Sequence, residues 1–281
     1  MTDETESPDE GRIKLKLQGN GYIEPEIQEE DYILGDGMLQ GEVLQPDGQW
    51  LDYLPDPELQ KRRGVETSNC VGFNTLENVE ILLKRKYGGV HNYSERALGI
   101  MAGTYPPGND PHKVAETIRK QGLVPEYELP FTENILTVDE YYNPKPLPES
   151  LIQRGKEWLF WYDFKHEYVF DKGASLDEKH RSIIEALKYS PLGVSVFAWA
   201  QDANGVYQKL GRDNHWTCLV GYKLGAYWLV RDSYEPHLKT LEWNYDFGIA
   251  KRYAITKHGS TPKKNYWWSR VYRRLGGLFT K

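Results

Sequence analysis

Three polar residues of this sequence have the types and the order that catalysis by a thiol needs. Cys70 begins an amphipathic stretch, His215 follows the polar turn GRDN, and Asp232 comes 17 residues later, in VRDSY. In such a set the thiolate attacks a carbonyl carbon, the imidazole transfers the proton, and the carboxylate holds the imidazole in one tautomer. The expected chemistry is therefore acyl transfer through a covalent acyl-enzyme.

Cys70 is expected to be the first residue of a helix. Ser68 or Asn69 can cap this helix, the glycine pair at 88–89 can end it, and apolar residues recur between them at helical spacing. The unpaired N–H groups and the positive end of the helix dipole favour a thiolate and can donate to an oxyanion. A cysteine at this position can also be a small buried residue, so Cys70 needs its two partners to indicate function.

His215 and Asp232 are expected on neighbouring strands. HWTCLVGY and AYWLVRDSY are β-branched and aromatic, and a short glycine-containing turn joins them. Antiparallel pairing would bring the start of the first strand beside the end of the second. Cys218 faces away from His215 and is expected to be a buried thiol. A hydrogen-bonded sheet histidine and a turn-capping aspartate are the alternative interpretations.

The order of elements predicts an α+β fold with two lobes. Helices are expected at 94–101, after Asp110 as far as Gly122, and from the capping box of Ser175 and Glu178 onward. Strand patterns, including GVSVFAW and a hairpin turn at 204–205, occupy the second half. We expect a helical N-terminal lobe and a C-terminal lobe built from an antiparallel sheet or barrel.

The chain divides into four parts by composition. Residues 1–20 are an acidic lead expected to be disordered, 21–60 an extended arm or pro-segment, 61–256 the folded domain, and 257–281 a basic, aromatic tail. If the arm is a pro-segment, cleavage near the basic residues 61–63 should raise activity; otherwise the arm is a structural strap. The tail can pack on the body, contact a protein assembly partner, or bind a membrane surface or phosphates.

The composition limits the remaining classes of function. A formal charge of −6 gives no reason to expect nucleic-acid binding, and no apolar run approaches the ~20 residues of a membrane span. The N-terminus has no secretory signal, and two cysteines cannot form a disulfide framework. Phosphate-loop, zincin and α/β-hydrolase motifs are absent, and no metal or other cofactor is expected. A reducing, cytoplasmic compartment is the expectation.

Several segments resemble papain-like (clan CA) cysteine peptidases. ETSNCVGFNTLENVE resembles the nucleophile helix of that family, EALKYSPLGVSVFAW its helix, proline and first central strand, and the segments bearing His215 and Asp232 its later catalytic strands. The 145 residues from Cys70 to His215 fit the ~130–150 expected there. The resemblance covers roughly 58–256. More narrowly, QPDGQWLDYLP and DSYEPHLKTLEWNYDFG resemble uncharacterised papain-like proteins of bacteriophages and microbial metagenomes.

The resemblance implies a peptidase of peptide or protein substrates with a Cys70–His215–Asp232 triad. The family usually has asparagine where this chain has Asp232, and tryptophan, which shields the third residue from water, where it has Tyr234. Its oxyanion glutamine lies six residues before the nucleophile, where this chain has Gly64. Gln60 is the candidate replacement if the intervening loop is longer.

The resemblance also places Phe197 and Asn214, with Tyr234, around a substrate pocket. The glycine pair with which the family binds substrate backbone is not found in its usual place. Two alternatives to a peptidase stay open. One is a papain-fold structural or assembly protein, as in a phage virion, and the other is a cell-wall amidase or transamidase, whose Cys-to-His separation is usually much shorter.

Overall fold

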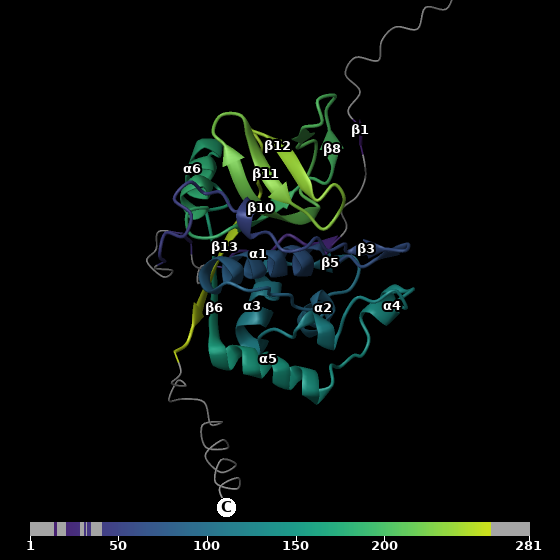
Figure 1. Ribbon diagram of the computed structural model, residues 1–281. Coiled ribbons are helices and arrows are strands. Elements are labelled where there is room, and N and C mark those ends of the chain that lie inside the picture. Colours follow the sequence, from purple (N-terminus) through teal and green to yellow (C-terminus); the bar gives the residue numbers. More distant parts are fainter. Residues whose placement is uncertain (1–13, 16–20, 29–30, 32, 35–40, 260–281) are drawn as a thin grey trace, which may run out of the picture.

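A computed structural model describes residues 14–15, 21–28, 31, 33–34 and 41–259 of the chain. Most of the acidic lead (1–20) and the basic tail from residue 260 onward lie outside the described residues, so the predictions made for them fall there too. Two lobes are visible in Figure 1, one helical and one dominated by strands, and helix α1 (Cys70–Tyr87) crosses the molecule between them. The predicted two-lobed α+β class is confirmed.

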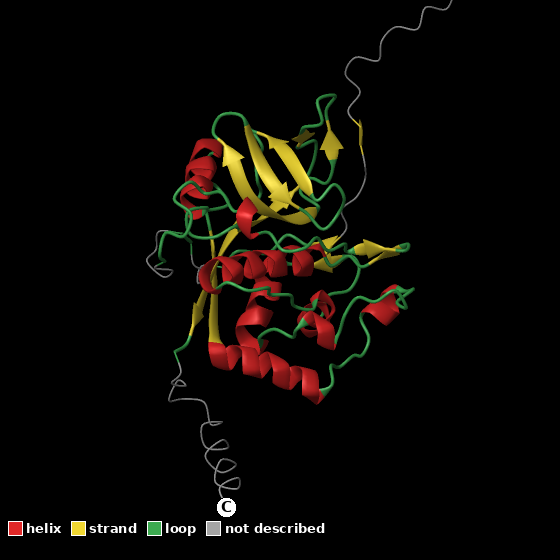
Figure 2. Cartoon of the chain, in the orientation of Figure 1, coloured by secondary structure: helices red, strands yellow, loops and turns green. Residues whose placement is uncertain are grey.

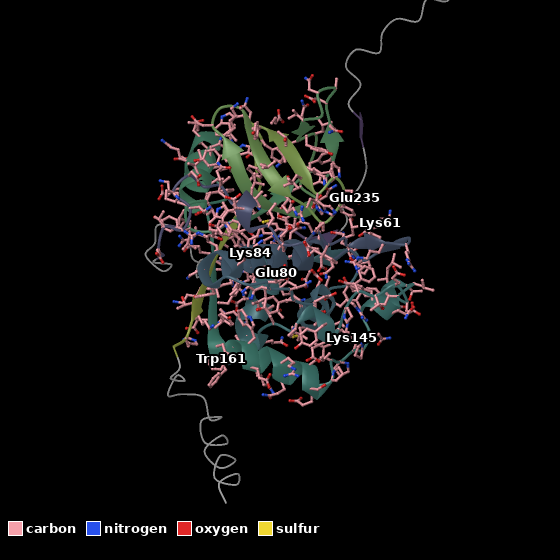
Figure 3. All side chains as sticks on the ribbon, in the orientation of Figure 1. Lys61, Glu80, Lys84, Lys145, Trp161 and Glu235 are labelled. Atoms are coloured by element: carbon pink, nitrogen blue, oxygen red, sulfur yellow. The ribbon has the colours of Figure 1, made fainter. Side chains whose placement is uncertain are left out.

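Helix α1 is buried along most of its length because both lobes pack against it. Thirteen of its residues are buried, including polar ones such as Asn74 and Glu80. Figure 3 shows Glu80 and Lys84 on this helix, in the middle of the molecule. A helix covered on most sides cannot show the one-sided apolar stripe of a surface helix. Its polar residues must therefore find partners inside the protein, and several of them do so at the candidate site.

The helical lobe lies on one side of α1. It consists of α2 (Glu95–Ala102), α3 (Pro111–Gln121), α4 (Val138–Tyr141), α5 (Glu149–Trp161) and the short 3-10 helix η2 (Glu126–Glu128). The predicted caps are present, since Asp110 accepts from the Lys113 N–H and Ser175 caps α6 (Leu176–Ala186), which lies beside the sheet. Helix α5 was not expected, because its glycine and bulky aromatic residues give no clean helical pattern.

A nine-stranded mixed sheet forms the other lobe and extends beside the helices (Figure 2). Its order is β1-β8-β9-β12-β11-β10-β7-β13-β6, and among these pairs only β12–β9 is parallel. The order does not close into a barrel among the described residues. The strands are β1 (Lys14–Leu15), β6 (Tyr162–Tyr168), β7 (Leu192–Val196), β8 (Ala200–Gln201), β9 (Tyr207–Gln208), β10 (His215–Lys223), β11 (Tyr227–Arg231), β12 (Leu238–Glu242) and β13 (Ala250–Lys257).

Two small sheets complete the described structure. In one, β2 (Gly21–Tyr22) pairs in parallel with β5 (Gly108–Asn109); in the other, β3 (Lys61–Arg62) and β4 (Val65–Glu66) form a hairpin. No helix in the described part of the chain combines the length and hydrophobicity that crossing a bilayer requires.

The second half of the arm packs into the core. Trp50, just before the 3-10 helix η1 (Leu51–Tyr53), is fully buried, and its indole N–H donates to the Leu187 carbonyl at 2.8 Å. The Trp50 backbone N–H donates to the Val220 carbonyl, so this segment is tied to both α6 and the sheet. Burying a tryptophan removes a large apolar surface from water. Residues around Trp50 therefore contribute to the stability of the folded domain.

Candidate active site

His215 and Asp232 meet at the point where β10 begins and β11 ends. Strand β10 pairs with β11 in antiparallel register, and Asp232 directly follows Arg231, the last residue of β11. His215 Nε2 lies 2.6 Å from Asp232 Oδ1, and both side chains are fully buried. The predicted juxtaposition of these two residues is therefore present.

Cys70 lies on the other side of the imidazole. It is the first residue of α1, and helix α1 packs along β10. The second ring nitrogen, His215 Nδ1, forms no hydrogen bond of good geometry within the described part of the chain, and the neighbouring Cys70 sulfur raises the pKa of the ring. The structure thus brings together all three residues that the sequence selected.

The electrostatics of this group favour a charged imidazole. Burial alone would lower the pKa of His215, but the Asp232 carboxylate and the Cys70 sulfur outweigh it and raise the pKa to about 10. Because the partners favour the protonated ring, His215 is an imidazolium at neutral pH. A proton on His215 is then already in place for delivery to a leaving group.

Lys239 is a fourth member of the group and was not among the residues predicted from the sequence. It lies on β12, it is buried, and its ammonium donates to Asp232 Oδ2 at 2.7 Å. It also donates to the carbonyls of Tyr234 and Pro236 and lies 4.9 Å from the centre of the Trp199 ring. Although burial would raise the pKa of Asp232, His215 and Lys239 lower it to about 2.

The lysine explains how a buried aspartate is accommodated at this position, where the resemblance to papain-like peptidases implies asparagine. A buried carboxylate is costly unless its charge is compensated. With Lys239 bound to one oxygen and His215 to the other, the Asp232 carboxylate has a cation on each side. In the sequence, the sign of such a partner is a lysine within PHLKTLE, an otherwise strand-like segment that closely follows Asp232.

Gln60 lies in the same region, although it stands ten positions before Cys70 instead of the six usual in the family. The β3–β4 hairpin accounts for the extra length, because it follows Gln60 directly. Gln60 is fully buried, and its Oε1 accepts a hydrogen bond from Ser233 Oγ at 2.7 Å. Its Nε2 donates to Glu66 Oε1 at 2.8 Å and to the Tyr234 hydroxyl at 2.7 Å. Its amide N–H groups are therefore occupied in this conformation.

Tyr234 lies against the histidine, as expected for a residue that shields the site. Its ring centre is 5.3 Å from that of His215, and only 3% of the residue is exposed. Its hydroxyl donates to Glu66 Oε2 at 2.7 Å. The Trp199 ring covers the imidazole as well, with its centre 5.6 Å away. Together these rings exclude water from the bond between His215 and Asp232.

Phe197 and Asn214 flank the histidine in the sheet. Asn214 precedes His215 and its Oδ1 accepts from the Ala198 N–H at 2.9 Å, whereas Phe197 follows the strand β7 that pairs with His215. Their assignment to a substrate pocket stays a prediction.

The first part of the arm covers the nucleophile. Strand β2 lies along β5, and the Ile23 N–H donates to the Asn109 carbonyl at 2.9 Å. A Cβ atom placed on Gly21, whose φ is +135°, would lie 2.9 Å from Cys70 Sγ and 2.7 Å from the Ser68 carbonyl oxygen. Only glycine fits so close to the thiol. Accordingly Cys70 has no exposed surface.

The sequence and the fold give different degrees of similarity to known proteins. Neither a protein-family model nor a curated protein sequence matches this chain. The fold is similar to that of digestive procathepsin L 3 of Tenebrio molitor larval midgut, with a TM-score of 0.53, 15% identity, and coverage of 80% of this chain and 73% of that one.

Two further cysteine-protease structures are similar. For bromelain from Ananas comosus, in complex with the E64 inhibitor, the TM-score is 0.51 at 19% identity, covering 73% of this chain and 97% of that one. The third structure contains the cysteine protease and lectin-like domains of Cwp84, a surface layer associated protein of Clostridium difficile. Its TM-score is 0.60 at 11% identity, and the match covers 92% of this chain and 64% of that one. The chain has the fold of papain-like cysteine proteases.

Proposed function

We propose that this protein is a cysteine peptidase that hydrolyses peptide or isopeptide bonds through an acyl-enzyme. The observation that carries the proposal is the placement of His215 between Asp232 and the helix-terminal Cys70. A helix N-terminus and an adjacent imidazolium are two of the environments that make a cysteine nucleophilic. The shared fold with cysteine proteases supports the same class of reaction.

The proposed reaction proceeds in two halves. The Cys70 thiolate attacks the substrate carbonyl, and the resulting oxyanion accepts hydrogen bonds from the N–H groups at the start of α1 and from Gln60 Nε2. The His215 imidazolium gives its proton to the leaving amine, and the neutral ring then takes a proton from the water that hydrolyses the thioester. Asp232 keeps the ring oriented with Nδ1 toward the sulfur. Glu66 must release the Gln60 amide for this hydrogen bond to form.

Turnover of peptides by the purified chain tests this proposal. A mixture of fluorogenic peptide amides should be hydrolysed, and E-64, the inhibitor found bound to bromelain, should stop hydrolysis by adding once to Cys70. The complete absence of turnover and of an E-64 adduct, with the arm displaced as described next, would contradict the peptidase proposal.

We also propose that residues 21–28 of the arm block the site in the resting protein. The backbone at Gly21 lies against Cys70, and Tyr22 stacks on Trp216 with ring centres 6.0 Å apart. Release of the arm should therefore precede catalysis. A cut at residues 61–63 would separate Gln60 and the buried Trp50 from the domain, so we expect such a cut to impair activity.

Substituting Gly21 with valine is expected to speed alkylation of Cys70 by at least about tenfold. Added carbon atoms cannot fit between the arm, the thiol and the Ser68 carbonyl, and a β-branched residue disfavours the positive φ. The rate of iodoacetamide labelling, followed by intact mass, measures the effect. Gly173→Val is the control, since a Cβ there meets no atom within 4 Å. Equal labelling rates in the wild type and Gly21→Val would show that the arm does not protect the thiol.

The burial of Cys70 beneath the arm also fits the alternative of an assembly protein, because a permanently covered thiol cannot act on a substrate. The two proposals differ in whether opening the arm produces turnover. A Gly21→Val variant that is labelled rapidly yet hydrolyses no peptide would favour the structural role.

A further inference from the structure

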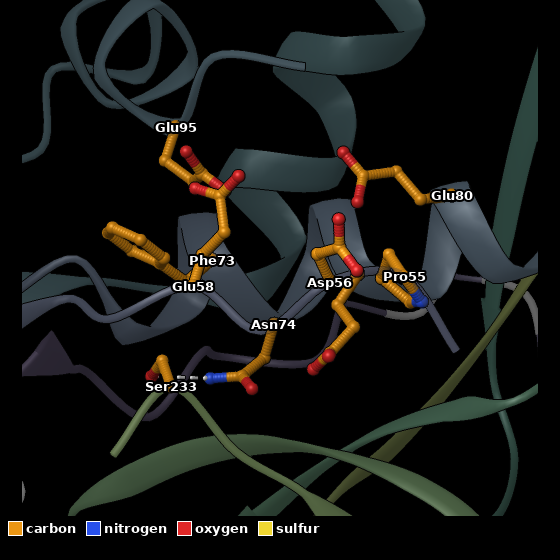
Figure 4. Close-up of a pocket in the computed structure, with 9 residues that line it drawn as sticks. Pro55, Asp56, Glu58, Phe73, Asn74, Glu80, Glu95 and Ser233 are labelled. Carbon is orange, nitrogen blue, oxygen red and sulfur yellow. Dashed lines mark hydrogen bonds between the residues drawn. The ribbon is translucent and has the colours of Figure 1, made fainter. Parts of the chain in front are cut away.

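Three carboxylates from separate segments, one buried and two half-buried, converge beside the candidate active site. Glu58 lies two residues before Gln60, Glu95 is the first residue of α2, and Glu126 is the first residue of η2. One carboxylate oxygen from each lies within 4.8 Å of the other two. Figure 4 shows the Glu58 and Glu95 carboxylates side by side at one end of a cavity that Glu80 also lines.

Each of these carboxylates leaves an oxygen without a hydrogen-bond donor. Asn92 Nδ2 donates to Glu58 Oε1 at 3.0 Å, and the Phe131 N–H donates to Glu126 Oε1 at 3.1 Å. In contrast, the Oε2 atoms of Glu58, Glu95 and Glu126 are buried and have no hydrogen-bond partner among the described residues. Glu95 is only 4% exposed, so water cannot easily replace the missing donor. Such orphaned oxygens are rare and call for a partner.

The nearby cations do not balance this charge. Arg62 lies 3.6 Å from Glu58 Oε2, and Arg96 lies close enough to act on Glu126, although its guanidinium N–H groups donate to backbone carbonyls. Among the other acids that line the cavity, Glu77 is paired with Arg231, and Glu80 accepts the Tyr93 N–H. Two arginines therefore face three clustered carboxylates, and a bound cation would supply the missing positive charge.

We propose that Glu58, Glu95 and Glu126 bind one divalent cation of the calcium class. Ca²⁺ takes oxygen ligands at about 2.3–2.6 Å, so oxygens up to roughly 5 Å apart can share one ion. The observed limit of 4.8 Å fits this range. Mg²⁺ binds at about 2.0–2.1 Å in a strict octahedron and retains several waters, which suits a buried and more widely spaced triplet less well. Zinc prefers nitrogen and sulfur, which these residues do not offer.

The site would brace the segments that carry the candidate catalytic groups. Glu58 belongs to the segment that continues into Gln60, and the Glu95 carbonyl accepts a hydrogen bond from Asn69 Nδ2 at 2.9 Å. Asn69 directly precedes Cys70. A cation bound here would fix the Gln60 segment and the start of α1 to the helical lobe, without touching the substrate.

Calcium binding to the full-length chain, freed of metal with EDTA and then desalted, tests the proposal. Titration calorimetry should give one Ca²⁺ per chain, and Ca²⁺ at about 100 times its Kd should raise Tm by roughly 5 °C. Tb³⁺ luminescence, sensitised by the surrounding aromatic residues and reversed by Ca²⁺, gives a second readout. Neither measurement depends on peptidase activity, so a failure here leaves the proposed function untouched.

Glu95→Gln and Glu126→Gln should each weaken Ca²⁺ binding at least tenfold, whereas Glu149→Gln on the exposed start of α5 should not. Glutamine keeps the shape of the side chain and removes a buried charge, so both variants are expected to fold, with a metal-free Tm at or above that of the wild type. The proposal is overturned if the wild type binds no Ca²⁺ at one per chain, or if the folded variants bind it as the wild type does. Binding lost in either folded variant supports it.

Discussion

His215→Ala is expected to lower kcat/KM for peptide hydrolysis by roughly 10³-fold or more, with most of the loss in kcat. The imidazolium holds the proton that the leaving amine must receive, and general acid–base catalysis of this kind contributes about 10²–10⁴-fold. The ring also stabilises the Cys70 thiolate, so its removal weakens the nucleophile as well. Initial rates with a fluorogenic peptide, measured in a background with the arm displaced, give the comparison.

The matched control for this prediction is His91→Ala. His91 Nε2 forms a hydrogen bond with the Gly88 carbonyl, at the end of α1 opposite to Cys70. Its substitution should leave kcat/KM within about twofold of the wild type, as is usual for substitutions away from a functional site. A His215→Ala variant that keeps more than a tenth of wild-type activity would rule out the assigned acid–base role.

Lys239→Met is expected to destabilise the protein by about 3–5 kcal/mol and to reduce kcat, because it leaves the Asp232 carboxylate with one cation. Asp232→Asn alone should also be costly, because it leaves the buried ammonium of Lys239 without its anion. The double variant removes both charges and introduces the asparagine usual in papain-like peptidases. It should be more stable than the sum of the two single losses predicts, with a coupling of about 1–3 kcal/mol.

The pH dependence of unfolding gives a readout that packing alone would not change. The pKa of Asp232 is lowered to about 2, so its ionisation contributes stability that is present above the unfolded-state value near 3.8 and is lost as pH falls toward 2. Without Lys239 the folded-state pKa should rise. The stabilisation should then shrink, and acid unfolding should begin at higher pH. If the two single losses simply add in the double variant, the charge pairing of Asp232 with Lys239 is not what stabilises this site.

The sequence carried enough information to predict the central geometry because each part depends on local patterns. Cys70 begins a helix marked by its termini, and β10 and β11 are joined by a tight turn, although an irregularity between Leu219 and Gly221 shifts their register before His215 is reached. Their side chains therefore had few alternative placements. Lys239 was missed because its relation to Asp232 depends on the path of the chain after β11, which no local pattern specifies.

The features that involve distant segments could not be predicted from spacing. The pairing of Gly21–Tyr22 with Gly108–Asn109 is only two residues long, so it leaves no alternation to detect. The carboxylates of Glu58, Glu95 and Glu126 meet only after three segments have packed together. Gln60 was the predicted oxyanion residue only if the loop between it and Cys70 is longer than in the family. The hairpin β3–β4 supplies that extra length.

The rate of Cys70 alkylation as a function of pH tests the central claim most directly. Iodoacetamide should add once to Gly21→Val, at Cys70, because burial raises the pKa of Cys218 well above its usual range and leaves that thiol protonated. Since the pKa of His215 is about 10, the ring keeps its charge through pH 8–9 and, on the proposed mechanism, holds the thiolate there, so the rate should be nearly constant across that interval. In Gly21→Val combined with His215→Ala, the rate should instead rise with pH like that of a free thiol, near 8.5. A rate that rises through pH 8–9 equally with and without His215 would contradict the proposal that the histidine activates Cys70.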